Sequence, residues 1–118
     1  AGQVADSGDN FIDASVTGSG ATVQPLVKAS GVVQAFNSLS IVAGASNKLC
    51  FCVTTDSFVG ATNGTLGTPD TSVTVPTTPN QLRFGLSYNY GYGSLWIQKL
   101  NYWSQRITNS EIQAFSKG

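Results

Sequence analysis

The sequence predicts an all-β protein, an antiparallel jelly-roll-like β-sandwich with one short C-terminal helix. Stretches rich in β-branched and aromatic residues recur about every 8–12 residues, with turn residues between them. The chain holds 13 Gly and 4 Pro, and only 10% of its residues are charged, so Ser, Thr, Asn, Gln and Gly must cover much of its surface. Its 118 residues suffice for one domain with its own core.

The N-terminal part of the chain divides into an arm and two strands. Residues 1–10 are polar and rich in Gly and Asp, so we expect a flexible arm there and a folded domain over residues 11–118. Alternation over residues 11–17 predicts a strand whose even-numbered side chains face inward. The next strand, residues 22–28, contains Pro25, which places that strand at a sheet edge or a bulge.

Turn residues divide the middle of the chain. Ser30–Gly31 and Asn37–Ser38 each predict a turn, and Asn63–Gly64 is the strongest hairpin signal because type I′ turns need positive φ at both central residues. Residues 65–80 contain three prolines and are expected to be irregular, with at most a short strand over 72–75. The strands expected around these turns cover residues 32–36, 39–43, 48–54, 56–62 and 81–86.

The C-terminal segment predicts a last strand, a turn at Gln105–Arg106 and a short helix. Apolar residues alternate at Leu95 and Ile97 and again at Leu100 and Tyr102, which is typical of a strand. The helix start is marked by a capping box of Thr108 with Glu111, and by Ile107 and Ile112 at the positions of a hydrophobic staple.

Charge and hydropathy exclude several classes of partner. The formal net charge is zero and no basic stripe is present, so we do not expect nucleic-acid binding. No apolar run approaches the ~20 residues of a membrane-spanning helix, so we expect no membrane insertion.

A weakly charged surface favours association with other copies of the chain. Since the chain starts at Ala1 without Met and shows no signal peptide, we expect a processed product or part of a longer polypeptide.

The two cysteines predict buried thiols rather than a metal centre. Cys50 and Cys52 lie on one expected strand, with Cα atoms about 6.5 Å apart and side chains parallel, at the limit of disulfide reach. A zinc site needs more ligands, and the chain has no His. We therefore expect free thiols made in a reducing cytoplasm, and no metal or cofactor.

The acidic residues do not form a catalytic pattern. No two of them share a strand at close spacing, and there is no nucleophile elbow, P-loop or dinucleotide fingerprint, so we do not expect an enzyme. A calcium site would draw on Asp56, Asn63 or Asp70, but their spacing matches no fixed calcium loop. The carboxylates of the chain are Asp6, Asp9, Asp13, Asp56, Asp70 and Glu111.

An aromatic loop is the candidate binding site. Tyr88, Tyr90 and Tyr92 share one face of an extended segment, and Asn89 adds an amide that can bond sugar hydroxyls. Trp96 lies out of phase with Leu95 and Ile97, so we expect it on the opposite face of the strand, where it either packs against another sheet or extends this surface. Three interpretations remain open for the tyrosines: glycan contact, packing against a neighbouring copy, and capping of the core.

Other C-terminal residues are expected to be structural. Trp103 should cover the helix with Phe115 beside it, and Arg106 should tie loop carbonyls or carboxylates at the corner.

The order of motifs over the last two thirds of the chain carries a family resemblance. The residues concerned are Asp56–Phe58, Asn63–Gly64, Asp70–Ser72, Val75–Pro76, Leu82–Gly85, Gly93, Leu95, Ile97, Tyr102–Trp103, Arg106–Thr108 and Glu111–Phe115. In this order they resemble the concanavalin A-like, or laminin G-like, jelly-roll domains of bacteriophage tail and virion proteins. Before Lys48 no such motif is present, and complete domains of that family are generally longer than this chain.

The resemblance implies a function and a location. It points to a non-catalytic, lectin-like domain of a tail fibre or virion surface protein that is made in the host cytoplasm and recognises host-surface glycan. The alternative is a purely structural virion protein, such as a capsid decoration or fibre oligomerisation domain. Both imply a homo-oligomer or contacts with other virion proteins, and fold alone does not choose between them.

Overall fold

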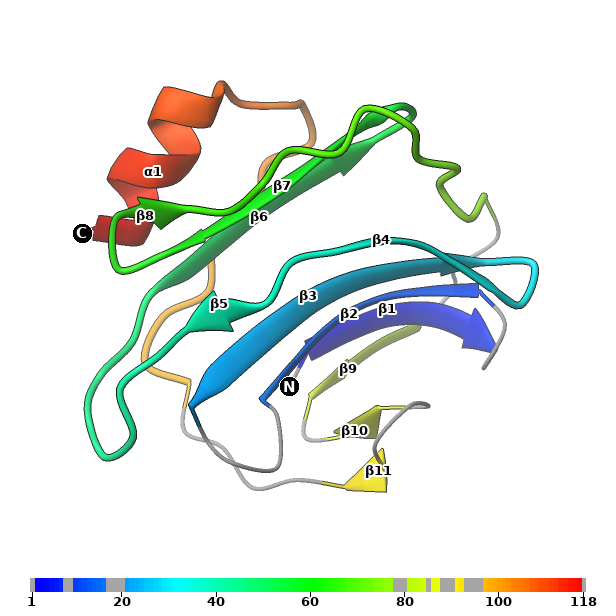
Figure 1. The fold of residues 1–118 in the computed structure, drawn as a ribbon. Coiled ribbons are helices and arrows are strands. Elements are labelled where there is room, and N and C mark those ends of the chain that lie inside the picture. Colours follow the sequence, from blue (N-terminus) through cyan, green and yellow to red (C-terminus); the bar gives the residue numbers. More distant parts are fainter. Residues whose placement is uncertain are drawn as a thin grey trace.

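The computed structural model confirms an all-β sandwich with one short C-terminal helix. It describes residues 2–7, 10–16, 21–77, 81–84, 86–87, 91–92 and 97–117. Two antiparallel sheets pack face to face, and helix α1 (Asn109–Lys117) lies on the outer side of the smaller sheet (Figure 1).

The larger sheet has six strands in the order β4-β3-β2-β1-β9, with β5 also paired to β3. Every pairing within it is antiparallel, and positive φ at Ser30 and Gly31 makes the turn between β3 and β4, as predicted. The strands are β1 (Gly2–Ser7), β2 (Asn10–Val16), β3 (Thr22–Ala29), β4 (Val32–Phe36), β5 (Leu39–Ser40) and β9 (Gln81–Phe84).

The N-terminal residues do not form the predicted arm. Gly2–Ser7 forms β1, which pairs with β2 on one side and β9 on the other, and Asn10 already belongs to β2. A polar sequence can occupy this place because ladder hydrogen bonds come from backbone groups, whatever the side chains are. The domain therefore includes the segment that composition alone assigned to an arm.

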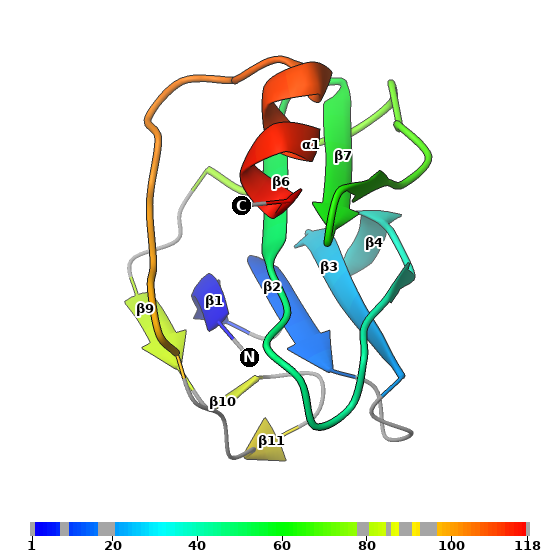
Figure 2. The same cartoon turned by 90° about the vertical axis from the view of Figure 1, so that its left-hand side faces the viewer.

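The smaller sheet consists of β6 (Leu49–Thr54), β7 (Ser57–Thr62) and β8 (Thr65–Leu66). Asn63 and Gly64 make the turn between β7 and β8 with φ of 49° and 87°, which confirms the predicted hairpin. A separate hairpin, β10 (Leu86–Ser87) with β11 (Gly91–Tyr92), lies across the larger sheet from β6 and β7 (Figures 1 and 2).

At β2 one face of the larger sheet is fully buried and the other is partly buried. Ile12 packs against the inter-sheet cluster of Val27, Ala35, Phe58 and Val73, as its predicted inward orientation requires. The odd-numbered side chains of β2 are nevertheless the most buried, and Val16 is exposed, so the expected inward and outward faces do not hold along the strand. These odd-numbered side chains are Phe11, Asp13 and Ser15, and the Ser15 hydroxyl donates a 2.7 Å hydrogen bond to the Asp13 carboxylate.

Pro25 lies in a central strand, whereas its type predicted an edge or a bulge. Its carbonyl accepts a 3.1 Å hydrogen bond from the amide of Asn37, which lies in the break between β4 and β5. In an antiparallel strand the amide and carbonyl of one residue point to the same side. The side on which proline lacks a donor therefore faces Asn37, in the break between β4 and β5, and not a residue of a paired strand.

The predicted C-terminal strand is absent from residues 97–103, which have no regular secondary structure. They run along one side of the sandwich, from the level of β9 up to α1 (Figure 2), and the Ser46 hydroxyl donates a 3.3 Å hydrogen bond to the Gln98 side chain. Among the described residues no strand pairs with them, so their alternating pattern has no ladder to join. Their side chains are left exposed as a result.

Candidate functional site

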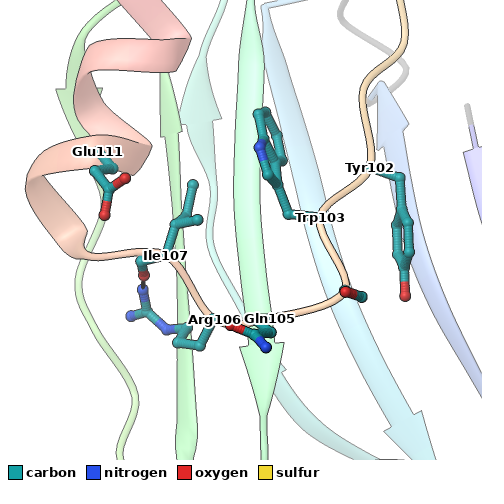
Figure 3. Close-up of a pocket in the computed structure, with 7 residues that line it drawn as sticks. Tyr102, Trp103, Gln105, Arg106, Ile107 and Glu111 are labelled. Atoms are coloured by element: carbon teal, nitrogen blue, oxygen red, sulfur yellow. Dashed lines mark hydrogen bonds between the residues drawn. The ribbon is translucent and has the colours of Figure 1, made fainter.

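An open groove with a volume of about 400 Å³ lies where the extended C-terminal segment meets α1. Figure 3 shows Tyr102 and Trp103 on the extended segment, Arg106 and Ile107 at the corner, and Glu111 on the first turn of α1. We call this surface the 102–111 groove. Its lining residues are Tyr102, Trp103, Ser104, Gln105, Arg106, Ile107 and Glu111.

The helical wall of the groove is fixed by the predicted capping box. The Thr108 amide donates to the Glu111 carboxylate and the Glu111 amide donates to the Thr108 hydroxyl, both at 3.1 Å. The pKa of Glu111 is lowered mainly by the hydrogen bond from the Thr108 amide. A hydrogen bond with the Thr108 side chain lowers it further, by a smaller amount. Ile107 packs against the buried cluster that contains Ile112, as the hydrophobic staple predicted. The groove therefore ends on a well-defined helix N-terminus.

Arg106 holds the corner between the two walls. Its guanidinium donates to the Ile107 carbonyl, to the Asn109 side chain at 2.7 Å and to the Ser57 hydroxyl of β7 at 3.3 Å (Figure 3 shows the first of these). The prediction that this arginine ties the corner through a loop carbonyl is confirmed. Because these bonds position the guanidinium, its main task is to fix the groove's shape.

Two aromatic residues, Tyr102 and Trp103, line the other side of the groove, and their side chains point in different directions (Figure 3). Tyr102 is 87% exposed and Trp103 is 40% exposed. The Trp103 ring lies 4.8 Å from the Phe115 ring with a tilt of 32°, so the predicted contact of Trp103 with the helix is confirmed. The exposure of Tyr102 was not predicted. The signal was an aromatic pair followed at once by two polar residues, Ser104 and Gln105, which also line the groove.

The chemistry of the groove suits recognition. Glu111 is the one carboxylate in the lining, and the capping box already engages it. Arg106 is likewise engaged by its own neighbours. The remaining groups are aromatic rings, the Gln105 amide and the Ser104 hydroxyl, which together offer an apolar surface edged by uncharged donors and acceptors.

Most of the aromatic loop predicted from the sequence lies outside the described residues. Tyr88, Asn89, Tyr90 and Trp96 belong to that group, while the backbone of Tyr92 is described in β11, paired with Leu86. The assignment of these residues to glycan or partner contact remains a prediction.

The cysteines are free thiols on β6. Cys50 is buried among Val59, Ala61 and Ile112, and Cys52 is half-buried. Burial and, to a smaller extent, the nearby Cys52 raise the pKa of Cys50 from 9.0 to about 11, although the charge of Arg106 acts in the opposite direction. A buried thiol of this kind behaves as a small apolar side chain.

The residues weighed for a calcium site are not brought together. Asp56 precedes β7 and Asn63 follows it, so they lie at opposite ends of that strand. Asp70 bonds to the Phe58 backbone, and its side chain accepts from the Ser72 amide at 2.9 Å. In the described part of the chain, no three His, Cys, Asp or Glu residues form a group able to hold a metal ion.

Comparisons with known proteins support the fold of the chain but assign it to no family. No protein-family model matches the chain, and no curated protein matches it. A solved structure of an S-layer domain-containing protein from Clostridium thermocellum, residues 221–444, is similar with a TM-score of 0.53 and 15% sequence identity. The match covers 97% of this chain and 60% of that structure. Within the described residues, no helix is long and apolar enough to span a membrane.

Proposed function

We propose that this protein is a non-catalytic recognition domain that binds surface carbohydrate, with the 102–111 groove as its binding surface. The observation that carries the proposal is Tyr102, a large ring left almost fully exposed beside Trp103 in an open groove. Exposed aromatic clusters with polar neighbours are typical of binding sites. Sugar C–H faces can stack on such rings while sugar hydroxyls bond the Gln105 amide and the Ser104 hydroxyl.

The groove is also organised before any ligand arrives. The capping box holds the helix start, Arg106 holds the corner, and Phe115 supports Trp103. A site that is already ordered loses less conformational entropy on binding. Binding residues on irregular segments supported by a rigid sheet are a common arrangement in recognition domains.

The biological setting that we propose is the one implied by the sequence resemblance, a lectin-like module of a phage tail fibre or virion surface protein. The structural neighbour is named as an S-layer domain-containing protein. A location on the surface of a particle or cell agrees with both the sequence resemblance and this structural neighbour. At 15% identity this neighbour supports only the fold of the proposed module. The proposal that the module lies on a phage virion rests on the sequence resemblance.

Glycan-array screening followed by calorimetric titration of the best ligand tests the proposal. We expect Tyr102→Ala and Trp103→Ala to weaken binding about tenfold or more, because each removes a stacking surface. Leu100→Ala is the matched control, since Leu100 is exposed on the same segment but does not line the groove. An array without any bound glycan, or undiminished binding by Tyr102→Ala, contradicts the proposal. Loss of binding in Tyr88→Ala or Tyr90→Ala alone would move the site to the aromatic loop.

A structural virion role is the second candidate, and one observation favours it. Ile97 and Leu100 are exposed apolar residues on the segment that leads into the groove, and Phe115 is an exposed ring beside Trp103. Exposed apolar side chains of this kind are suited to subunit packing. If Tyr102→Ala lowers the mass of the protein in solution while no glycan binds, this surface is a subunit contact and the structural role is the better explanation.

A further inference from the structure

Strand β4 is a free edge of the larger sheet with an unusual composition. The strand order places β4 at one end of the sheet, and among the described residues β3 is the one strand that pairs with it. Of its five residues, Val32, Val33 and Phe36 are 59%, 48% and 54% exposed. An edge strand presents unpaired backbone donors and acceptors, so exposed apolar side chains beside them make a surface ready for another strand.

The edge lacks the charges that keep most edge strands apart. No Asp, Glu, Lys or Arg occurs between Lys28 and Lys48, a stretch that includes the whole of β4 and β5. Monomeric proteins blunt their edges with lysines, prolines, inward charges or bulges. Of these, β4 carries a bulge: the pairing with β3 skips Gln34, whose side chain accepts a 3.3 Å hydrogen bond from the Thr74 amide.

We infer that β4 is a homotypic interface, at which β4 of a second copy pairs antiparallel and joins the larger sheets of two molecules. A two-fold antiparallel pairing brings a strand against its own sequence. A charged strand would then meet its own charge, whereas this one meets uncharged Val, Gln and Phe side chains. A second copy therefore brings an uncharged, apolar strand of the same sequence to this edge, with no like charges facing each other.

The geometry predicts a weak dimer. A ladder of five residues spans about 17 Å, against molecular extents of 34 × 31 × 22 Å. The bulge at Gln34 further divides the ladder into two short parts. An interface of this size belongs to the concentration-dependent class.

The pairing leaves the 102–111 groove free. Figure 2 shows β4 on one side of the molecule and the segment that leads into the groove on the opposite side. A dimer would thus present two grooves, and two weak sites on one particle bind a repetitive surface more tightly than one. The dimer itself does not depend on what the groove binds.

Sedimentation equilibrium of the intact chain over a wide concentration range tests the inference. We expect a reversible monomer–dimer equilibrium, with dimerisation weakened about tenfold or more in Val33→Lys and in Val33→Glu. Val42→Lys is the matched control, because Val42 is also exposed (62%, against 48% for Val33) and lies in the same uncharged stretch but outside β4. A wild-type chain that stays monomeric throughout, or a Val33→Lys chain that dimerises like wild type, overturns the inference.

A mixing experiment separates a lost interface from a damaged fold. Equal amounts of Val33→Lys and Val33→Glu should form a mixed dimer, since opposite charges then meet at the edge. Misfolded chains would not regain association on mixing, and that result would also count against β4. Glycan binding by the Val33→Lys monomer is measured in parallel, so that failure of the dimer and failure of the groove are told apart.

Discussion

The side-chain carbonyl of Asn37 accepts a 2.8 Å hydrogen bond from the backbone amide of Gly60, across the space between the two sheets. The Asn37 side-chain amide donates to the Thr68 carbonyl at 3.0 Å, and its backbone amide bonds Pro25. One residue in the break of the larger sheet therefore satisfies backbone groups of both sheets. The fit is close, since a Cβ added at Gly67 would lie 2.6 Å from the Asn37 side-chain oxygen.

Replacing Asn37 with Ala should destabilise the protein by about 1–3 kcal/mol, because the buried amide of Gly60 loses its partner and the exposed Thr68 loses a part-buried bond to its carbonyl. The measurement is the free energy of unfolding in urea. Ser38→Ala is the control, since Ser38 is the exposed neighbour in the same break and should change stability by less than about 0.5 kcal/mol. Equal losses in the two variants would show that Asn37 does not link the sheets.

The capping box should make stability depend on pH in the acid range. The pKa of Glu111 is lower in the folded chain than its ordinary value of 4.5, so the folded state favours the ionised carboxylate. The stabilisation is therefore complete above pH 4.5 and is lost as the pH falls through the lowered pKa.

Thermal unfolding of Glu111→Gln tests this dependence. A glutamine can still accept the Thr108 amide but does not titrate, so the difference in Tm between wild type and variant should change as the pH falls below the ordinary pKa. Thr108→Ala should cost about 1 kcal/mol at neutral pH, as expected for loss of an N-cap hydroxyl. A difference in Tm that stays constant with pH would show that the carboxylate's charge does not stabilise the helix start.

Cys50 should be an unreactive thiol at neutral pH. Its pKa is raised to about 11, mainly by burial, and only the thiolate attacks disulfide reagents. The Cys52→Ala variant, which retains Cys50 alone, should therefore react slowly with a disulfide reagent in the native state and fast in denaturant. The Cys50→Ala variant retains the half-buried Cys52 and should react faster. Faster native reaction at Cys50 than at Cys52 would contradict the burial that the structure assigns.

The same shift has a consequence for stability at alkaline pH. The pKa of Cys50 is higher in the folded chain, so the protonated thiol favours the folded state. The resulting contribution to the free energy of unfolding is fully present below pH 9.0 and is lost as the pH rises towards 11. The Cys50→Ala variant should lose less of its stability over that interval than wild type, as measured by urea unfolding at several pH values.

The sequence alone determined the features whose physics is local. The turns at Ser30–Gly31 and Asn63–Gly64 follow from residues that accept positive φ, and the capping box follows from bonds that span three residues. The strands β6 and β7 follow from β-branched and aromatic composition beside those turns. Each of these needs no knowledge of the rest of the chain.

Only the tertiary structure decided the features that depend on distant neighbours. Gly2–Ser7 is a strand because β2 and β9 pair with it, while residues 97–103 have a strand pattern but no partner strand among the described residues. Pro25 is tolerated in a central strand because the break at Asn37 faces it. The groove follows the same rule: the pair Tyr102–Trp103 is visible in the sequence, but its exposure depends on where α1 and the sheets leave space. Local preferences fix φ, ψ and caps, whereas burial and pairing belong to contacts between segments far apart in the chain.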